Sequence, residues 1–416
     1  MFFVYQIIIS LIVFLSPIII IYRITNDKED KKRFIEKFAI ATKKRNNGKL
    51  IWFHGSSVGE ILSIIPLIKY YEKEKSVKQI LITSSTLSSS KIIKKFKFKK
   101  TIHQFFPIDH LCIVNKFLNY WRPNIAIFIE SEIWPCIFKK LYKNNIPLIL
   151  LNARLTRKTF NRWNSVKSFS QTIFEKIFSA YPQNYETKNY LKKLNIRKIN
   201  YIGNIKFAET NYNSKENLKE NLKKQFSNKK IWIASSTHDG EEIFCAKAHK
   251  KLKKKIKNLI TIIIPRHIHR VNKIIKEIKH LNLKTFTHSS KSKNLNNIDI
   301  YIVDTFGETH KFHKIGSTVF LGGSIINRGG QNPLEAARFG AQILHGPYTG
   351  NFKDVYKFLK SIKASKKIKS INELASSIIF KKDKQSGLKI KNIGEKILKK
   401  TIKELNSIIY DEYKKT

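Results

Sequence analysis

The chain has 416 residues, of which 80 are Lys or Arg and 30 are Asp or Glu, so its formal net charge is +50. Hydrophobic residues make up 42% and aromatic residues 12%, which is enough to bury a core and excludes a disordered, collagen-like or low-complexity protein. The length predicts about two or three domains. The three cysteines, Cys112, Cys136 and Cys245, form no C-x-x-C pair, which favours a reducing compartment and excludes a disulfide scaffold or a Cys-rich zinc site.

The positive charge has three interpretations. Lys and Arg can neutralise the phosphates of a nucleic acid. The same cations would be attracted by the anionic head groups of a membrane. Most of the excess, however, is Lys scattered through sequence rich in Ile and Asn, which is typical of an ordinary solvated surface. Charge alone leaves the three interpretations open.

The first 22 residues form an uncharged, strongly apolar segment. A helix of this length rises about 33 Å, enough to cross a hydrocarbon core of about 30 Å. A cleaved signal peptide would need a basic start, a shorter apolar stretch and a cleavage site with small residues. We therefore predict an uncleaved transmembrane anchor at residues 1–22. The cations that follow it, from Arg23 to Lys37, place the rest of the chain on the cytoplasmic side.

Beyond the anchor, short apolar runs alternate with longer amphipathic stretches. In the first half, strands are predicted at 50–54, 79–83, 125–129, 147–151 and 201–203, and helices at 61–73 and 112–121. In the second half, strands are predicted at 231–234, 259–264, 300–303, 319–321 and 342–345, and a Lys-rich helix at 390–413. This alternation is typical of parallel βαβ units.

A polar segment at 209–230, rich in Asn, Lys and Glu, separates the two halves and is expected to hold a linker and a helix. The sequence therefore predicts two doubly wound α/β domains with a ligand at the carboxyl ends of their strands. Several motifs are absent from the sequence: the P-loop, the G-x-G-x-x-G dinucleotide fingerprint and the H-E-x-x-H zinc motif. Nucleoside-triphosphate hydrolysis and redox chemistry are therefore disfavoured.

The sequence HGSSVGE places a carboxylate at a strand-to-helix turn. The apolar strand ends at His54, a loop of small residues follows, and a helix begins near Val58, so Glu60 lies in its first turn. Ser57 and Glu60 have the spacing of a capping box, in which the carboxylate only satisfies a backbone N–H. The same position suits a general base at the mouth of the sheet. Spacing alone leaves both interpretations open.

Two further carboxylates, Glu130 and Glu132, directly follow the apolar strand at 125–129. Burying a carboxylate is costly without a partner, so such a pair usually faces a cleft or a cation. A solvated loop or a structural ion pair would explain them as well. Cations follow other predicted strands of the same half, namely Arg154, Arg157 and Lys206.

Four loops at strand ends of the second half, at 234–242, 262–267, 304–308 and 321–335, together favour a nucleotide site. Glycines allow close approach of backbone N–H groups to a phosphate, a helix N-terminus attracts it, and Arg266 can bind it through two N–H groups. Asn332 is predicted to cap a helix that begins at Pro333, with Glu335 completing the capping pattern. Each loop by itself would be an ordinary turn.

These motifs, taken in order, resemble those of one known family. HGSSVGE, ESEIWP, NARLTRKT, GNIKF, ASSTHDGEE, PRHIHR, DTFGE and GGSIINRGGQNPLE together resemble the 3-deoxy-D-manno-octulosonic acid (Kdo) transferases, glycosyltransferases of the inner membrane that act in lipopolysaccharide assembly. The resemblance extends from the anchor to beyond residue 350.

The resemblance implies a GT-B fold, an α/β architecture of two Rossmann-like doubly wound domains that face one another across a cleft, plus an N-terminal transmembrane helix. The expected division is an anchor at 1–22, an acceptor domain at 23–208, a linker at 209–230 and a CMP-sugar-binding domain with the C-terminal helix at 231–416.

The resemblance also implies the reaction, which moves Kdo from CMP-Kdo to a hydroxyl of the lipid A precursor lipid IVA, with inversion and with neither a metal nor a cofactor. Glu60 matches the family's general base, and Glu130 and Lys206 match positions that stabilise the transition state. The stretches that hold CMP match Pro265, Arg266, Phe306, Gly307, Glu308, Asn332, Pro333, Leu334 and Glu335. The implied partners are CMP-Kdo, the lipid acceptor and the inner membrane, with the catalytic domains on its cytoplasmic side, and no nucleic acid.

Three departures from the family pattern stand out. Gly55 and Ser56 replace an Ala-Val pair, Gln331 stands where His is common, and Ala208 stands where Asp usually follows Lys-Phe. We expect them to affect packing and the fine positioning of the nucleotide and of Lys206. Two other functions remain as alternatives: a GT-B transferase that uses another activated sugar, and a membrane-tethered nucleic-acid-binding protein. The second leaves Glu60, Glu130 and the four loops unexplained.

Overall fold

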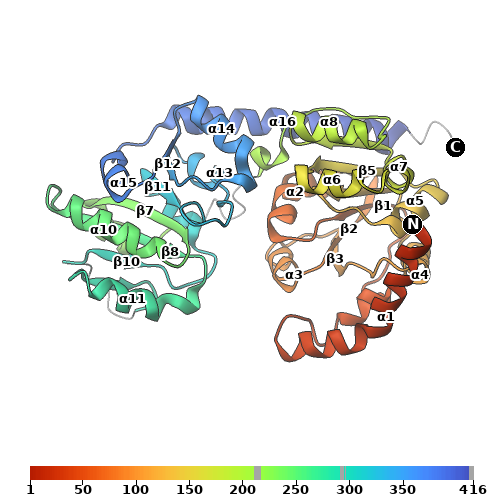
Figure 1. Cartoon of the computed structure of the whole chain (residues 1–416), viewed down its shortest axis with the longest axis horizontal. Helices are drawn as coiled ribbons and strands as arrows, with labels where there is room; N and C mark the ends of the chain where they lie inside the picture. Colours follow the sequence, from red (N-terminus) through yellow and green to blue (C-terminus); the bar gives the residue numbers. More distant parts are fainter. Residues whose placement is uncertain (210–216, 291–294, 296, 412–416) are drawn as a thin grey trace. The chain divides into compact units, whose positions relative to one another are not determined.

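The computed structural model describes residues 1–209, 217–290, 295 and 297–411. It divides into two compact units, unit 1 (Met1–Glu209 and Gly394–Thr416) and unit 2 (Thr210–Ile393). Each unit contains one parallel β-sheet with helices between the strands (Figure 1). The prediction of two parallel α/β domains, the kind of domain of which a GT-B protein has two, is confirmed.

The sheet of unit 1 has the strand order β3-β2-β1-β4-β5-β6, and all of its pairings are parallel. The order reverses between β1 and β4, which is the switch point of a doubly wound fold, where ligands bind outside the carboxyl ends of the strands. The strands are β1 (Lys49–His54), β2 (Val77–Ser84), β3 (Thr101–Phe105), β4 (Ile125–Ile129), β5 (Leu148–Ala153) and β6 (Ser179–Pro182).

The sheet of unit 2 has the strand order β13-β12-β11-β7-β8-β10-β9, again with parallel pairings. Its order reverses between β7 and β11. The strands are β7 (Lys230–Thr237), β8 (Leu259–Pro265), β9 (Thr285–Thr287), β10 (Ile300–Ile302), β11 (Thr318–Leu321), β12 (Gln342–His345) and β13 (Ser365–Lys367).

Helices connect the strands in both units. Those of unit 1 are α1 (Phe2–Thr25), α2 (Val58–Tyr71), α3 (Leu87–Lys94), α4 (Leu111–Trp121), α5 (Pro135–Lys143), α6 (Arg157–Asn164), α7 (Lys167–Phe174) and α8 (Tyr185–Lys193), with the 3-10 turns η1 (Phe34–Phe38) and η2 (Ile205–Ala208). Those of unit 2 are α9 (Glu220–Ser227), α10 (Glu241–Lys253), α11 (Val271–Lys279), α12 (Thr309–His313), α13 (Leu334–Ala337), α14 (Lys353–Ser361) and α15 (Ile371–Ser377), with the turns η3 (Ile268–Arg270) and η4 (Gly350–Phe352). The last helix, α16 (Lys384–Asp411), begins in unit 2 and ends in unit 1.

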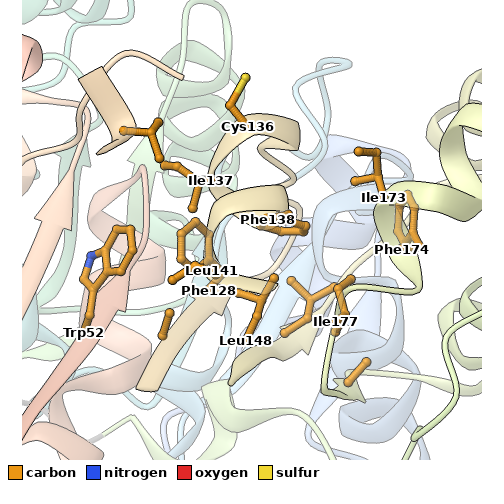
Figure 2. Packing of buried hydrophobic residues seen from close by; sticks show 14 of the residues in the cluster. Trp52, Phe128, Cys136, Ile137, Phe138, Leu141, Leu148, Ile173, Phe174 and Ile177 are labelled. Atoms are coloured by element: carbon orange, nitrogen blue, oxygen red, sulfur yellow. The ribbon is translucent and has the colours of Figure 1, made fainter. Parts of the chain in front are cut away.

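The apolar runs of the sequence form the central strands, and aromatic side chains fill the space between them and the helices. In unit 1, Trp52 of β1 and Phe128 of β4 pack edge to face with ring centroids 5.1 Å apart, and Phe138 of α5 packs on Phe128 at 5.6 Å (Figure 2). Strands buried on both faces read as continuous apolar runs, which is why β1 and β4 were predictable from hydropathy. The rigid core holds the strand ends that carry the polar residues.

One predicted strand is wrong. Residues 201–203 do not form a strand, and the sixth strand of the sheet is instead β6. An isolated bridge joins Ala180 of β6 to Ile199, in the segment that follows α8. Gly203 has a φ of +102°, which an extended strand cannot contain, and a Cβ there would lie 2.8 Å from Ile397 Cδ1. Hydropathy also missed the short or polar strands β3, β6, β9 and β13.

The end of the chain differs from the predicted division, which assigned 231–416 to one domain. Residues 394–416 group with unit 1. Leu405 and Ile408 are buried there, the Tyr71 hydroxyl donates to Asn406 at 3.0 Å, and Lys49 Nζ donates to the Ile409 carbonyl at 3.0 Å. The predicted tail helix begins earlier, at Lys384, and its expected last residues, 412 and 413, lie outside the described residues, as do residues 210–216 of the predicted linker.

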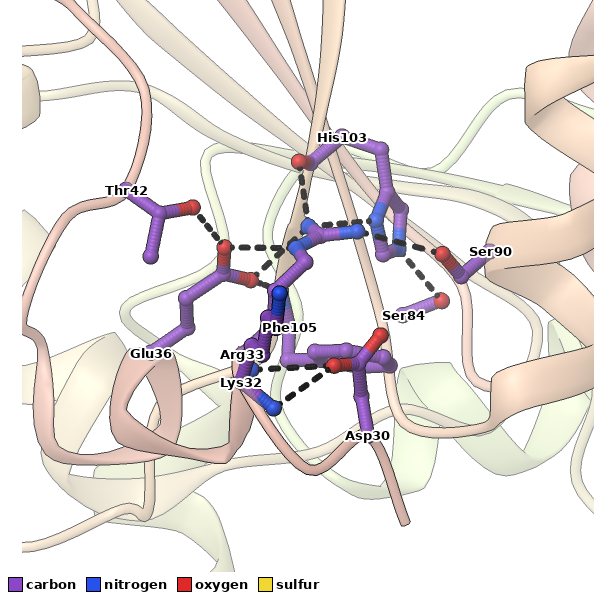
Figure 3. Close-up of polar contacts among 9 residues, drawn as sticks. All are labelled: Asp30, Lys32, Arg33, Glu36, Thr42, Ser84, Ser90, His103 and Phe105. Carbon is purple, nitrogen blue, oxygen red and sulfur yellow. Dashed lines mark hydrogen bonds and ion pairs between the residues drawn. The ribbon is translucent and has the colours of Figure 1, made fainter.

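The segment that follows α1 is fastened to the sheet edge by a buried polar cluster (Figure 3). Arg33 forms an ion pair with Glu36 at 2.8 Å and donates to the carbonyl of His103 in β3 at 2.7 Å. Glu36 also accepts from the backbone N–H of Phe105 at 2.7 Å and contacts Thr42. The charges compensate one another inside the protein, as buried charges must. This cluster fixes the chain between α1 and β1 against the edge strand β3.

Candidate functional site

Glu60 lies in the first turn of α2, directly after the carboxyl end of β1. The Glu60 N–H donates to the N-cap Ser57 Oγ at 3.3 Å, the Ser57 hydroxyl donates to Glu60 Oε1 at 2.7 Å, and the Ser56 N–H donates to Glu60 Oε2 at 2.8 Å. The carboxylate therefore does cap the helix. These contacts also hold it in one orientation, which is what a proton acceptor needs.

The surroundings of Glu60 make it a stronger base than an ordinary glutamate. Burial, together with the negative charges of Glu130 and Glu132, raises the pKa of Glu60 to about 7, while the hydrogen bonds from Ser57 and Ser56 act in the opposite direction. A general base works best when its pKa lies near the operating pH. Glu60 is thus positioned and tuned for proton transfer near neutral pH.

Glu130 and Lys206 form an ion pair in the interior of unit 1. The distance from Lys206 Nζ to Glu130 Oε1 is 2.5 Å, and the two side chains are 11% and 9% exposed, respectively. Glu130 follows the last residue of β4 with a φ of +60°, a left-handed conformation that costs a non-glycine residue energy and that often marks functional sites. The pair joins two of the predicted site residues.

The position of Lys206 is set by its neighbours. Lys206 lies in η2, where the Asn204 side chain accepts from the Lys206 N–H at 3.0 Å and the Asn152 side chain of β5 accepts from the Ile205 N–H at 3.1 Å. Gly394 of α16 approaches this turn so closely that a Cβ there would lie 2.1 Å from the Phe207 carbonyl oxygen. The end of β5 and the C-terminal helix together fix the turn that carries Lys206.

Glu132 and His54 form a second polar pair beside Glu130. His54 Nε2 lies 3.1 Å from Glu132 Oε2, its Nδ1 lies 3.0 Å from Thr83 Oγ1, and its ring stacks on Phe106 with the centroids 3.7 Å apart. Trp134 Nε1 also donates to Glu132 Oε2 at 2.9 Å. Burial opposes the ionisation of Glu132, but the hydrogen bond from His54 holds the pKa of this carboxyl below its usual value. Glu132 therefore keeps a negative charge next to Glu60.

In unit 2, one buried carboxylate organises two of the predicted nucleotide loops. Glu241 of α10 accepts four backbone hydrogen bonds, at 2.7 to 3.1 Å, from His238, Gly323, Ser324 and Ile325. A Cβ on Gly322 would lie 2.3 Å from the Ser236 carbonyl oxygen, so glycine is required there. The loops after β7 and β11 are thus joined through Glu241, a residue to which the sequence assigned no role.

Cations gather at the carboxyl ends of β7 and β8. Arg266 directly follows Pro265, the last residue of β8, and its side chain is exposed, while its N–H donates to the Thr237 carbonyl at 2.9 Å. Burial and the positive charges of His267, Arg328 and Arg266 lower the pKa of His238. Such a cluster of cations suits an anionic ligand.

Phe306, Gly307 and Glu308 follow β10, the neighbour of β8 in the sheet. Phe306 is 77% exposed and Gly307 has a φ of +88°. Glu308 accepts from Lys311 Nζ at 2.7 Å and pairs with His288 Nε2 at 2.7 Å. Phe306 and Glu308 also line a cavity of about 350 Å³ against α9.

The stretch from Asn332 to Glu335 follows β11. The Asn332 side chain accepts from the Leu334 N–H at 3.0 Å, as a helix cap does, but the helix begins at Leu334, one residue later than predicted, and α13 has only 4 residues. One turn of helix has a weak dipole, so it adds less to anion binding than the sequence suggested. Glu335 Oε2 lies 3.9 Å from Nδ1 of the buried His313.

The structure therefore brings the predicted residues together in two groups. Glu60, Glu130 and Lys206 lie at the carboxyl ends of the strands of unit 1, and the residues expected to hold CMP follow β8, β10 and β11 at one edge of the sheet of unit 2. Among the described residues, no group of three or more His, Cys, Asp or Glu side chains could hold a metal ion.

Comparison with known proteins gives the family. Residues 32–209 match the 3-deoxy-D-manno-octulosonic-acid transferase (kdotransferase) family. A 3-deoxy-D-manno-octulosonic acid transferase of Rickettsia bellii is 35% identical over 398 residues, which cover 95% of this chain and 94% of the relative. The chain belongs to the Kdo transferase family. A Kdo transferase of Haemophilus influenzae is 29% identical over 360 residues, which cover 84% of this chain and 83% of that relative.

This Kdo transferase also shares its fold with solved structures. The solved structure of a glycosyltransferase of Rickettsia africae superposes with a TM-score of 0.55 at 13% identity. The superposition covers 88% of this chain and 100% of the chain of that structure. At this identity the likeness concerns the fold alone. The roles of Glu241 and His54 in this Kdo transferase were not predicted from the sequence. The only sequence signal for Glu241 was an acidic residue in the first turn of a helix that follows a glycine.

Proposed function

We propose that this Kdo transferase moves Kdo from CMP-Kdo to a hydroxyl of the lipid A precursor lipid IVA, with inversion at the anomeric carbon and without a metal. The observation that carries the proposal is Glu60, a carboxylate with a pKa of about 7, held by Ser56 and Ser57 at the position that matches the family's general base. Unit 1 supplies the base, and unit 2 binds the nucleotide.

In the proposed reaction, Glu60 takes the proton of the acceptor hydroxyl while that oxygen attacks the anomeric carbon of Kdo. The bond from this carbon to the phosphate oxygen of CMP-Kdo breaks, and its electron pair leaves with CMP. The transition state has oxocarbenium character, so the negative charge of Glu130 stabilises the sugar. A single displacement of this kind inverts the anomeric centre.

The charge that grows on the leaving phosphate needs a cation. Arg266 is exposed at the end of β8, beside the loops that Glu241 holds, and can form two N–H bonds to a phosphate. The rest of CMP is proposed to contact the residues that match the family's nucleotide-binding stretches: Pro265, Phe306, Gly307, Glu308, Asn332, Pro333, Leu334 and Glu335. Lys206 stays next to Glu130 and limits the repulsion between Glu130 and Glu60.

We also propose that the chain is attached to the cytoplasmic side of the inner membrane through α1, where its lipid acceptor lies. The support is that α1 is long and apolar enough to cross a membrane: it has 24 residues, and an 18-residue stretch of it has a mean hydropathy of 2.6. The sequence predicts that residues 1–22 cross the membrane once, but the attachment proposed here does not depend on whether α1 crosses it.

The proposal is tested with the purified full-length protein, CMP-Kdo and a tetra-acylated lipid A precursor, with the products weighed by mass spectrometry. We expect a mass increase of one or more Kdo units, and transfer slowed by about 10²-fold or more with Glu60→Gln. Parallel reactions with UDP-sugars test the alternative donor. Transfer from a UDP-sugar in the absence of transfer from CMP-Kdo would overturn the proposed donor.

A further inference from the structure

The inference concerns how α1 lies relative to the membrane, and it rests on the membrane attachment proposed above. Its burial follows a helical pattern. The residues with reduced exposure recur every three or four positions, and the pattern runs through Tyr5, Gln6, Ile9, Val13, Ser16 and Ile20. Side chains with this spacing lie on one face of a helix. We call this the inner face, and it covers nearly the whole length of α1.

The inner face is attached to unit 1 at the beginning of the helix. The Tyr5 hydroxyl donates to Oδ2 of the buried Asp109 at 2.6 Å, and Gln6 Nε2 lies 2.8 Å from Sγ of the buried Cys136. Phe2 and Tyr5 pack against the hydrophobic core of unit 1, each with its ring centroid 6.5 Å from that of Phe169. Asp109 is itself fixed, because it accepts from the backbone N–H groups at the start of α5.

The other end of α1 is attached to the same unit. Arg23 donates to the buried Glu29 at 3.0 Å, and Glu29 also pairs with Lys37. The chain from there to β1 is held on β3 by the buried pair of Arg33 and Glu36 (Figure 3). A helix of 24 residues is about 36 Å long, so the two attachment points lie far apart along unit 1.

In the middle of the inner face, a serine and an isoleucine are buried next to a proline. Pro17 has no N–H to donate to the carbonyl of Val13, and the hydroxyl of Ser16 donates to that carbonyl at 2.6 Å instead. Ser16 and Ile20 are 4% and 6% exposed. The Ser16 side chain, at the centre of the helix, is thus buried, and its hydroxyl has a hydrogen-bond acceptor within the helix itself.

The opposite face of α1 is uncovered and largely apolar. Phe3, Ile7, Leu11, Phe14, Ile18 and Ile21 are each more than half exposed. Contiguous exposed apolar surface of this size marks an interaction site. Cations stand at both ends of it: Lys139 Nζ lies 4.1 Å from the ring centroid of Phe2, and Lys28, Lys31 and Lys32 are exposed just after the helix. A crossing helix is expected to carry cations mainly at its cytoplasmic end.

From these observations we infer that α1 lies in the surface of an anionic bilayer, with its inner face held on unit 1 and its outer face in the lipid, instead of crossing the membrane. One folded unit cannot hold both ends of a helix that separates the two sides of a bilayer. A helix in the membrane surface keeps every contact described above and buries the exposed apolar face. The cations at both ends then meet lipid head groups.

The test is a depth measurement on the full chain. The exposed Cys112 is replaced by Ser, the buried Cys136 and Cys245 are retained, and single spin labels are attached through Phe3→Cys, Leu11→Cys and Ile21→Cys. The protein is reconstituted in bilayers of phosphatidylcholine and phosphatidylglycerol, and the accessibility of each label to oxygen and to a water-soluble nickel complex gives its depth. We expect three similar, shallow depths. A profile with position 11 deep and positions 3 and 21 near opposite surfaces would overturn the inference.

A matched pair of labels provides the control. Ser16→Cys on the inner face and Phe14→Cys on the outer face lie at the same level of the helix. We expect only the label at position 14 to contact lipid, whereas equal oxygen accessibility at both positions would overturn the inference. No binding to these vesicles would also overturn it. Depth is independent of catalysis, so a crossing helix with normal Kdo transfer refutes this inference alone, and shallow depths without transfer refute the proposed reaction alone.

Discussion

Lys206 Nζ lies 2.5 Å from Glu130 Oε1, and both side chains are buried. Removing one partner of such a pair leaves an uncompensated charge in the interior, which costs about 3 kcal/mol or more. We therefore expect Lys206→Met to lower the free energy of unfolding of unit 1 by about this amount and to abolish transfer. The double variant Lys206→Met with Glu130→Gln should regain much of the stability and none of the transfer. Chemical denaturation and turnover measure the two effects, and a single variant as stable as the parent would contradict the prediction.

The cap and base roles of Glu60 can be separated. Gln at position 60 can still accept from the Ser56 N–H but cannot take a proton, so Glu60→Gln should lose transfer by about 10²-fold or more while it retains CMP binding. Ser57→Ala removes the N-cap and should cost about 1 kcal/mol of stability. It also removes a hydrogen bond that lowers the pKa of Glu60, so little transfer should be lost above about pH 8, where Glu60 is still ionised. Turnover and thermal unfolding of both variants test this. Near-normal turnover of Glu60→Gln would remove Glu60 from the mechanism.

The pH dependence of transfer follows from the same carboxyl. The pKa of Glu60 is raised to about 7, so the active, ionised form is lost as the pH falls below that value. We expect kcat/KM to fall about tenfold per pH unit on the acid side of pH 7. Glu132→Gln removes a nearby negative charge and should shift this limb to lower pH. Profiles measured from pH 5 to about 9 test the shift, and an unshifted limb would show that Glu132 has no influence on the base.

Arg266 is expected to act on the nucleotide and not on the acceptor. A hydrogen bond to a charged group contributes about 1.5–3 kcal/mol, so Arg266→Ala should weaken CMP binding by about 10- to 100-fold. Lys357→Ala, at an exposed lysine of α14 in the same unit, is the matched control and should bind CMP normally. Calorimetric titration with CMP at two salt concentrations distinguishes a specific contact from general charge. Equal losses in both variants would contradict the assignment.

Glu241 is expected to hold the nucleotide loops in place. In Glu241→Gln the side-chain amide would turn an N–H group toward backbone N–H donors that now bind a carboxylate oxygen. Each buried donor left without an acceptor costs about 1–3 kcal/mol. We expect lower stability of unit 2 and weaker CMP binding, whereas Glu220→Gln on the surface of α9 should change neither. Unchanged CMP affinity in Glu241→Gln would show that the loops do not depend on this carboxylate.

Much of the fold was predictable because the signals are local. A continuous apolar run predicted β4 to the residue, since strands covered on both faces leave little polar sequence within them. The edge strands β3 and β13 carry polar residues and were missed, and residues 201–203 were predicted as a strand although Gly203 is left-handed. The Ser57–Glu60 capping pattern was also readable, because its partners are three residues apart.

By itself, the sequence determined the two α/β halves, the apolar N-terminal segment and the strand ends at which Glu60, Glu130, Arg266 and Phe306 stand, because periodicity and turn chemistry act over a few residues. Only the tertiary structure decided which distant groups meet: Lys206 with Glu130, Glu241 with a loop 82 residues away, Tyr5 with Asp109 at a separation of 104 residues, and the end of α16 with unit 1. These contacts depend on the order of strands in each sheet and on burial, which lowers the local dielectric and strengthens the interaction of charges that have no relation in the linear chain.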